Sequence, residues 1–106
     1  MRLLLHESLP IRLRRSLSDH AVKTVVEMRW GGVKNGRLLA LAAMAFDVFI
    51  TVDKNLQHQQ NPATLPIAVI VLDARSIELA DLLPLLPSLE KSLASLHPRS
   101  LTTLKL

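Results

Sequence analysis

Four short apolar runs, each followed within two residues by an acidic residue, limit the fold of this chain more than any other feature. The runs cover residues 2–5, 21–26, 48–52 and 67–72, and the acidic residues that follow them are Glu7, Glu27, Asp53 and Asp73. Short runs rich in Leu, Ile and Val are typical of strands that are buried on both faces of a sheet. Segments with helical spacing of Leu and Ala lie between them. This alternation predicts an α/β fold with a central, mainly parallel sheet of four or five strands and helices on both faces.

Two connections in the first half of the chain carry helix signals. Ser8 followed by Pro10 is typical of a helix start, and the apolar spacing predicts that this helix ends near Leu17. A loop with paired glycines covers residues 28–36, and a second helix is expected from Arg37 until just before Asp47.

The second half of the chain carries weaker signals. Residues 56–60 are polar and favour only a short helical turn. Ser76 is expected to cap a helix that Pro84 and Pro87 kink or divide, with an apolar stripe of leucines continuing to Leu96. The last six residues, 101–106, favour a fifth strand at the edge of the sheet.

Length, composition and charge narrow the class of protein. The 106 residues suit a single domain over 1–106, and the absence of Cys excludes disulfides and thiolate metal sites. No apolar stretch is long enough to span a membrane, and the start is too short for a signal peptide, so a cytoplasmic location is expected. The net charge of +4 and a pI of about 10.1 favour an anionic partner such as RNA.

The acidic residues that follow the strands are expected to gather at one edge of the sheet. The carboxyl ends of parallel strands meet there, and ligands of open α/β sheets bind at that edge. Carboxylates without thiolates suit hard cations such as Mg²⁺ or Mn²⁺, which activate water and hold a phosphodiester. The alternative remains that these residues only form turns, because Asp is common in turns after strands.

Four segments in this order resemble the small PIN-like domains of prokaryotes. They are residues 4–10 (Leu-Leu-His-Glu-Ser-Leu-Pro), 27–32 (Glu-Met-Arg-Trp-Gly-Gly), 34–39 (Lys-Asn-Gly-Arg-Leu-Leu) and 46–56, which includes Thr51-Val52-Asp53-Lys54-Asn55-Leu56. The resemblance covers nearly the whole chain and implies a three-layer α/β fold. It also implies cleavage of RNA at a divalent-metal cluster, in the manner of VapC-type toxins that pair with a cognate antitoxin.

This chain departs from the family pattern at three positions. His6 stands where relatives carry the Asp that resembles the first metal ligand of PIN nucleases, and Arg37 stands where they carry an acidic residue. Arg29 stands where Gly is more usual, whereas Glu7, Glu27, Asn35 and Asp53 are kept. Imidazole suits softer ions than Mg²⁺, and Arg37 would repel a cation, so both changes weaken the expected metal site.

The resemblance assigns a role to each candidate site residue. The metal ligands are expected to be Asp53, Glu7 and His6, and the catalytic carboxylates Asp53, Glu7 and Glu27. The substrate-binding residues are expected to be Asn35, Lys34, Arg37, Lys54 and Trp30. For Asp53 the competing role is to cap the short helix near Asn55, and for Trp30 it is to pack under the glycine loop.

Two functions follow, from different classes. The first is a metal-dependent ribonuclease, the toxin of a toxin–antitoxin pair. The second is a catalytically inactive module that binds RNA or a protein partner, which the changes at His6 and Arg37 favour. A phosphoacceptor domain of the receiver type would need a Lys after a late strand, and none follows the run 67–72. A homodimer is expected from the apolar surface of the leucine-rich last helix.

Overall fold

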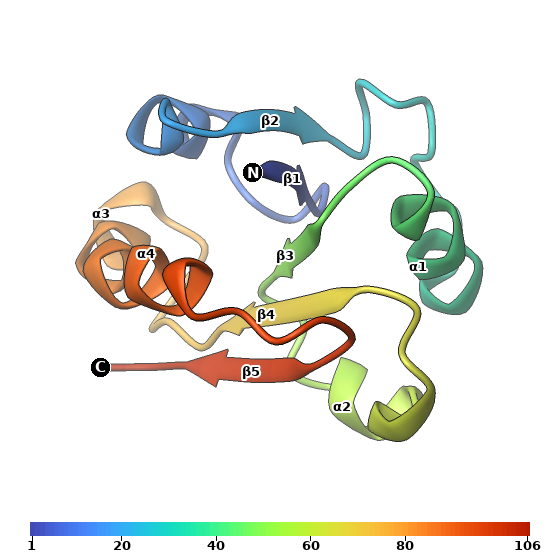
Figure 1. Ribbon diagram of the computed structural model, residues 1–106. Coiled ribbons are helices and arrows are strands. Elements are labelled where there is room, and N and C mark those ends of the chain that lie inside the picture. The colour runs from blue at the N-terminus through green and yellow to red at the C-terminus, as the bar shows by residue number, and fades with distance from the viewer.

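The computed structural model covers all 106 residues and contains a five-stranded sheet (Figure 1). All neighbouring strands are parallel, and their order across the sheet is β2-β1-β3-β4-β5. The strands are β1 (Arg2–Leu5), β2 (Ala21–Thr24), β3 (Val48–Thr51), β4 (Ala68–Leu72) and β5 (Leu101–Leu104). The predicted α/β class and parallel sheet are therefore confirmed, including the fifth strand at the edge.

The connecting segments form short helices on both sides of this sheet. The α-helices are α1 (Asn35–Ala43), α2 (Leu56–Gln59), α3 (Leu79–Leu82) and α4 (Leu86–Ala94). The 3-10 helices are η1 (Ile11–Leu17), η2 (Pro62–Thr64) and η3 (Leu83–Leu85). Pro84 and Pro87 lie where α3, η3 and α4 meet, which confirms that the prolines divide the last helical segment.

Alternate residues of each central strand build two separate cores. Leu3, Leu5, Ile50, Ile70 and Leu72 pack against leucines of η1, α3, η3 and α4. The residues between them, such as Leu4, Phe49 and Val69, pack against α1 and α2. Because side chains alternate between the two faces of a strand, β3 and β4 are buried on both sides. This explains why their sequences are unbroken apolar runs.

The chain reverses its direction across the sheet after β2, so the connections that leave β1 and β3 run in opposite directions. It runs from β1 outward to β2, returns over β1 to β3, and then continues to β4 and β5. The gap between β1 and β3 is therefore the topological switch point of the sheet, where ligands of open α/β folds bind at the carboxyl ends of the strands. His6 and Glu7 follow β1 at this point, and Asp53 lies two residues after β3.

The last crossover has the opposite hand from the other three. The connections β3–β4 and β4–β5 move across the sheet in the same direction, but α2 lies on one face and α3 and α4 lie on the other (Figure 1). The β2–β3 connection has the same direction and the same face as β3–β4, and so the same hand. The β1–β2 connection runs in the opposite direction over the opposite face, which again gives the same hand. Parallel crossovers are almost always right-handed, so the β4–β5 connection is the exception, a left-handed crossover.

The helix predicted from Arg37 until just before Asp47 is α1, Asn35–Ala43, and Ser76 does not cap α3, which begins at Leu79 after Glu78. Two further boundaries differ from the prediction for local reasons. Ser8 does not cap η1, because its hydroxyl is paired with the ring of His6, and the residue before η1 is Pro10. Strand β2 ends at Thr24 and not at Val26, because Thr24 and Glu27 close a turn. The Thr24 N–H donates to the Glu27 carboxylate (2.9 Å), and the Glu27 N–H donates to the Thr24 hydroxyl (3.1 Å).

None of the helices combines the length and the apolar character that crossing a membrane would require.

Candidate functional site

The switch point brings His6, Glu7 and Asp53 together at the carboxyl edge of the sheet. The His6 N–H donates to the Ile50 carbonyl (2.9 Å), so the backbone pairing of β1 and β3 continues to the residue before Glu7. Burial lowers the pKa of His6 below 6.5, and the negative charges of Glu7 and Asp53 act against this shift. Both carboxylates therefore lie close enough to His6 to influence its protonation.

The Asp53 carboxylate is held by two donors. The Asn55 N–H donates to Oδ1 (3.0 Å), and the Asn35 amide donates to Oδ2 (3.4 Å) and also to Oε1 of Gln59 (3.2 Å). The Asp53 N–H in turn donates to the buried Thr51 hydroxyl (3.1 Å). Asp53 thus closes the turn before α2, as the turn-forming alternative expected, and it also connects β3 to the first residue of α1.

The paired glycines of the 28–36 loop lie against Glu7. The Gly32 N–H donates to Oε1 of Glu7 (3.5 Å), and a Cβ added at Gly31 would lie 3.6 Å from Oε2. Gly32 has a φ of +79°, which favours glycine. The loop therefore covers one side of the carboxylate, and substitution at Gly32 would strain the turn.

The side chain of His6 is held in place by contacts with Ser8 and Phe49. Its Nδ1 lies 2.7 Å from the Ser8 hydroxyl and 3.4 Å from the Ser8 backbone nitrogen. Its ring packs edge-on against Phe49, with ring centroids 5.7 Å apart. The neutral imidazole that burial favours is the form that can accept a hydrogen bond or a metal.

Glu27 is engaged in a different interaction. Its carboxylate accepts the Thr24 N–H and pairs with the Arg14 guanidinium, and these contacts lower its pKa, the backbone hydrogen bond being the largest cause. The structure therefore places Glu27 in the turn after β2, and its catalytic role stays a prediction.

The expected substrate-binding residues lie around the amino end of α1 and the loop after β3. Lys34 precedes α1, Arg37 lies in its first turn, and both are exposed without an ion pair. Trp30 packs edge-on against Phe46 (6.2 Å between centroids) and against the core beneath the loop, as the packing alternative expected. Lys54 is ion-paired with Asp73 (2.9 Å).

The side chains at the switch point were tested for their fit to a divalent metal. No group of three or more His, Asp or Glu side chains lies close enough together to hold an ion. Each Asp53 oxygen accepts one N–H hydrogen bond, which fixes the orientation of the carboxylate. Mg²⁺ prefers near-octahedral oxygen coordination, so two carboxylates, Glu7 and Asp53, beside the imidazole of His6 are a poor fit.

Two basic residues at this edge, Arg75 and Lys105, are not among the site residues predicted from the sequence. Arg75 lies three residues after β4, and Lys105 directly follows β5. A lysine therefore does follow a late strand of the sheet, after β5 and not after β4. Lys105 lines a hollow with Asp73 and Lys54, and no lysine is ion-paired with Asp53. The predicted fifth strand covers residues 101–106 and so includes Lys105, whereas β5 ends at Leu104 and leaves Lys105 at the carboxyl edge.

Comparison with models of protein families, with curated proteins and with solved structures finds no match to this chain.

Proposed function

We propose that this chain is a PIN-like module that binds RNA at the carboxyl edge of its sheet and does not itself cleave the strand. The residues at the switch point support the absence of cleavage. His6 stands beside two carboxylates, Glu7 and Asp53, and no group of three His, Asp or Glu side chains could hold an ion. Hydrolysis of a phosphodiester by metal ions needs a bound cation that activates water and stabilises the leaving oxygen.

The amino end of α1 supports binding of an anion. This helix has no acidic residue in its first turn and no side chain that caps its first N–H groups. Free N–H groups and the helix dipole attract phosphate, and the charges of Lys34 and Arg37 add to this attraction. Asn35, which begins the helix, is already oriented by Asp53 and Gln59. RNA as the particular anion is supported by the family resemblance and by the net charge of +4.

Binding of a fluorescein-labelled single-stranded RNA, followed by anisotropy, tests this proposal. We expect binding without a divalent metal, weakening as salt rises because phosphate contacts release counterions. Lys34→Gln together with Arg37→Gln should weaken binding about tenfold, since each basic contact contributes to the phosphate term. Arg12→Gln together with Arg15→Gln, which removes the same charge from exposed positions in η1, is the control. Equal losses in both double variants would contradict a specific site at α1.

A ribonuclease is the second candidate, because Glu7 and Asp53 follow β1 and β3 at the switch point, where ligands of open α/β sheets bind. In this function Mg²⁺ or Mn²⁺ is the cofactor, the activity is that of a toxin, and the partner is a cognate antitoxin. Incubation of the purified protein with RNA and either metal separates the candidates. Cleavage that a chelator stops and that Asp53→Ala abolishes would overturn the non-cleaving proposal, whereas Asp19→Asn, at the opposite edge before β2, should change nothing.

A homodimer and a cytoplasmic location complete the proposal. The leucines of α3, η3 and α4 are mostly buried against the sheet, and Leu83 is the exposed one. Sedimentation equilibrium of the wild type and of Leu83→Glu tests the dimer: a monomer in both samples would contradict it. A small antitoxin-like reading frame beside the gene would support the toxin function over the non-catalytic one.

A further inference from the structure

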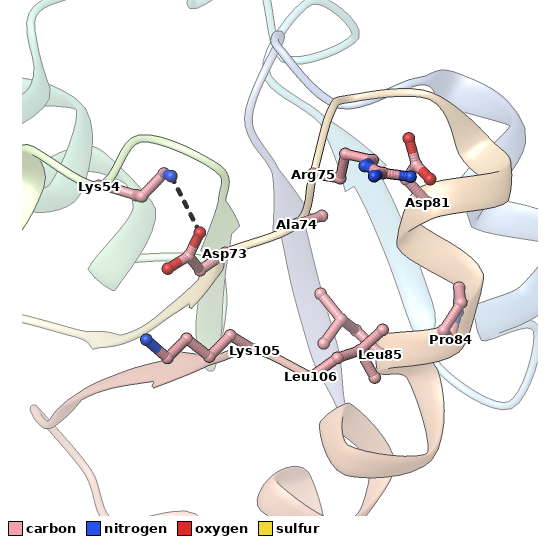
Figure 2. A pocket seen from close by; sticks show the side chains of 9 residues that line it. All are labelled: Lys54, Asp73, Ala74, Arg75, Asp81, Pro84, Leu85, Lys105 and Leu106. Carbon is pink, nitrogen blue, oxygen red and sulfur yellow. Dashed lines mark ion pairs between the residues drawn. The ribbon is translucent and has the colours of Figure 1, made fainter.

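A second basic cleft opens at the same edge of the sheet, beyond β3. Figure 2 shows its lining: Lys54 from the loop after β3, Asp73 and Arg75 after β4, and Lys105 after β5, with Asp81 of α3 on the far wall. The cavity has a volume of about 550 Å³. A smaller hollow of about 360 Å³ shares Lys54, Asp73 and Lys105, so these side chains stand between two open depressions.

Two of the cationic side chains in this cleft have no ion-pair partner. Among the lining side chains, three cations face two carboxylates. Asp73 is neutralised by Lys54 (2.9 Å), and Asp81 accepts a hydrogen bond from the Ser76 hydroxyl (2.6 Å). Arg75 and Lys105 make no ion pair and no side-chain hydrogen bond, and both are exposed. Two cations that share one cavity without partners repel each other, and an anion between them would remove that repulsion.

The chemistry of these two cations favours a phosphate group. The guanidinium of Arg75 offers a planar fork of N–H donors that matches two phosphate oxygens, and Lys105 supplies a mobile point charge. A divalent cation would be repelled, and the two carboxylates disfavour ligands with several negative charges at one point. A singly charged phosphodiester therefore suits the cleft better than a free di-anionic phosphate.

The position of Lys54 connects this cleft to the switch point. Lys54 lines both hollows. Its neighbour in the chain, Asp53, accepts a hydrogen bond from Asn35 at the amino end of α1. We infer that the cleft lined by Lys54, Arg75 and Lys105 binds a phosphodiester of the RNA strand that passes the amino end of α1. This inference rests on the proposed function, because it assigns a further phosphate of the same bound RNA to residues that the proposal does not use.

Two titrations followed by ¹H–¹⁵N NMR test the inference, one with a single-stranded RNA oligonucleotide and one with inorganic phosphate. We expect RNA to shift the amide signals of residues 74–76 and 103–105 together with those of residues 34–37. Arg75→Gln with Lys105→Gln should lower RNA affinity about tenfold and reduce the slope of log K against log salt by about 0.7 for one lost phosphate contact. Arg12→Gln with Arg15→Gln is again the charge-matched control and should leave that slope nearly unchanged.

Each outcome separates the inference from the proposed function. If RNA binds wild type but the cleft variant behaves as the control does, the inference is overturned and the proposed function stands. If RNA does not bind but inorganic phosphate shifts the cleft signals in wild type and not in the variant, the cleft is an anion site and the RNA proposal is overturned. If neither ligand shifts residues 74–76 and 103–105, the inference is wrong.

Discussion

Replacement of Arg29 by Gly should stabilise the protein. Arg29 has a φ of +62°, in the left-handed region, and its side chain is exposed with no ion pair or side-chain hydrogen bond. A non-glycine residue in this region costs about 1–2 kcal/mol. Gly gives back about 0.4–1 kcal/mol of that gain, because it leaves the unfolded chain more freedom. The net expectation is a stabilisation of about 0.5–1 kcal/mol, or about 3–6 °C in Tm for a domain of this size.

Urea denaturation followed by circular dichroism measures this change in the free energy of unfolding. Two control variants show whether it comes from the left-handed backbone or from the loss of the side chain. Gly32→Ala in the same loop, at a φ of +79° with open space around it, should lose about 1 kcal/mol for conformational reasons alone. Arg37→Gly, which removes an exposed Arg from helical backbone in α1, should lose about 0.5–1 kcal/mol. If Arg29→Gly destabilises as Arg37→Gly does, the left-handed backbone at Arg29 is not a source of strain and the reasoning fails.

Three further predictions follow from buried groups and from the incomplete site. Because burial lowers the pKa of His6 below 6.5, the folded state binds this proton less readily than the unfolded state, so stability should be full above pH 6.5 and decline as the pH falls below it. His6→Asn should flatten that part of a plot of unfolding free energy against pH, and an unchanged slope would assign it to other groups. Leu89→Ala, at a fully buried position of α4, should cost about 2–5 kcal/mol, whereas Leu83→Ala at an exposed position should cost well under half of that. His6→Asp with Arg37→Glu should create Mn²⁺ affinity, read as Mn²⁺-dependent NMR line broadening around Glu7 and Asp53; equal broadening in the parent would show that the site was never incomplete.

The sequence predicts the strands because they carry their own signal. Residues 48–51 and 68–72 are apolar at every position apart from Thr51, since both faces of β3 and β4 are covered, and no tertiary information is needed to see this. The division of the last helix is equally local, because Pro84 and Pro87 lack the N–H group that a continuous helix needs. Parallel strands also explain why the residues that follow β1 and β3, among them Glu7 and Asp53, lie at the same edge of the sheet.

Contacts between distant segments could not be predicted in the same way. The Glu27 carboxylate contacts Thr24 and Arg14, and nothing in the sequence indicates the Arg14 contact, because it depends on η1 packing beside β2. The pair Lys54–Asp73 and the cleft around it depend on which strands become neighbours and on where α3 begins. The departure at position 29 was visible in the sequence, but its conformational meaning required the backbone dihedral angle.

The left-handed last crossover places α3 and α4 on the same face of the sheet as η1. The core on the α1 face is built from residues 4–71, most of them close in the chain, whereas the core on the other face joins Leu9, Leu13 and Leu17 to Leu82, Leu89 and Leu93. Loops that span such distances close slowly and late in folding. The His20–Glu90 pair (3.0 Å) is a polar contact across the same gap.

Release of residues 73–106 would remove β5 from the edge together with α3 and α4, and would leave the order β2-β1-β3-β4 intact. Segments of this kind open as cooperative units below the free energy of global unfolding. In native-state hydrogen exchange, the amides of α4 and β5 should therefore exchange together and before those of β1 and β3. The residues that line the second cleft, Arg75 and Lys105, belong to this unit, so a ligand that joins them to Lys54 would also slow its opening.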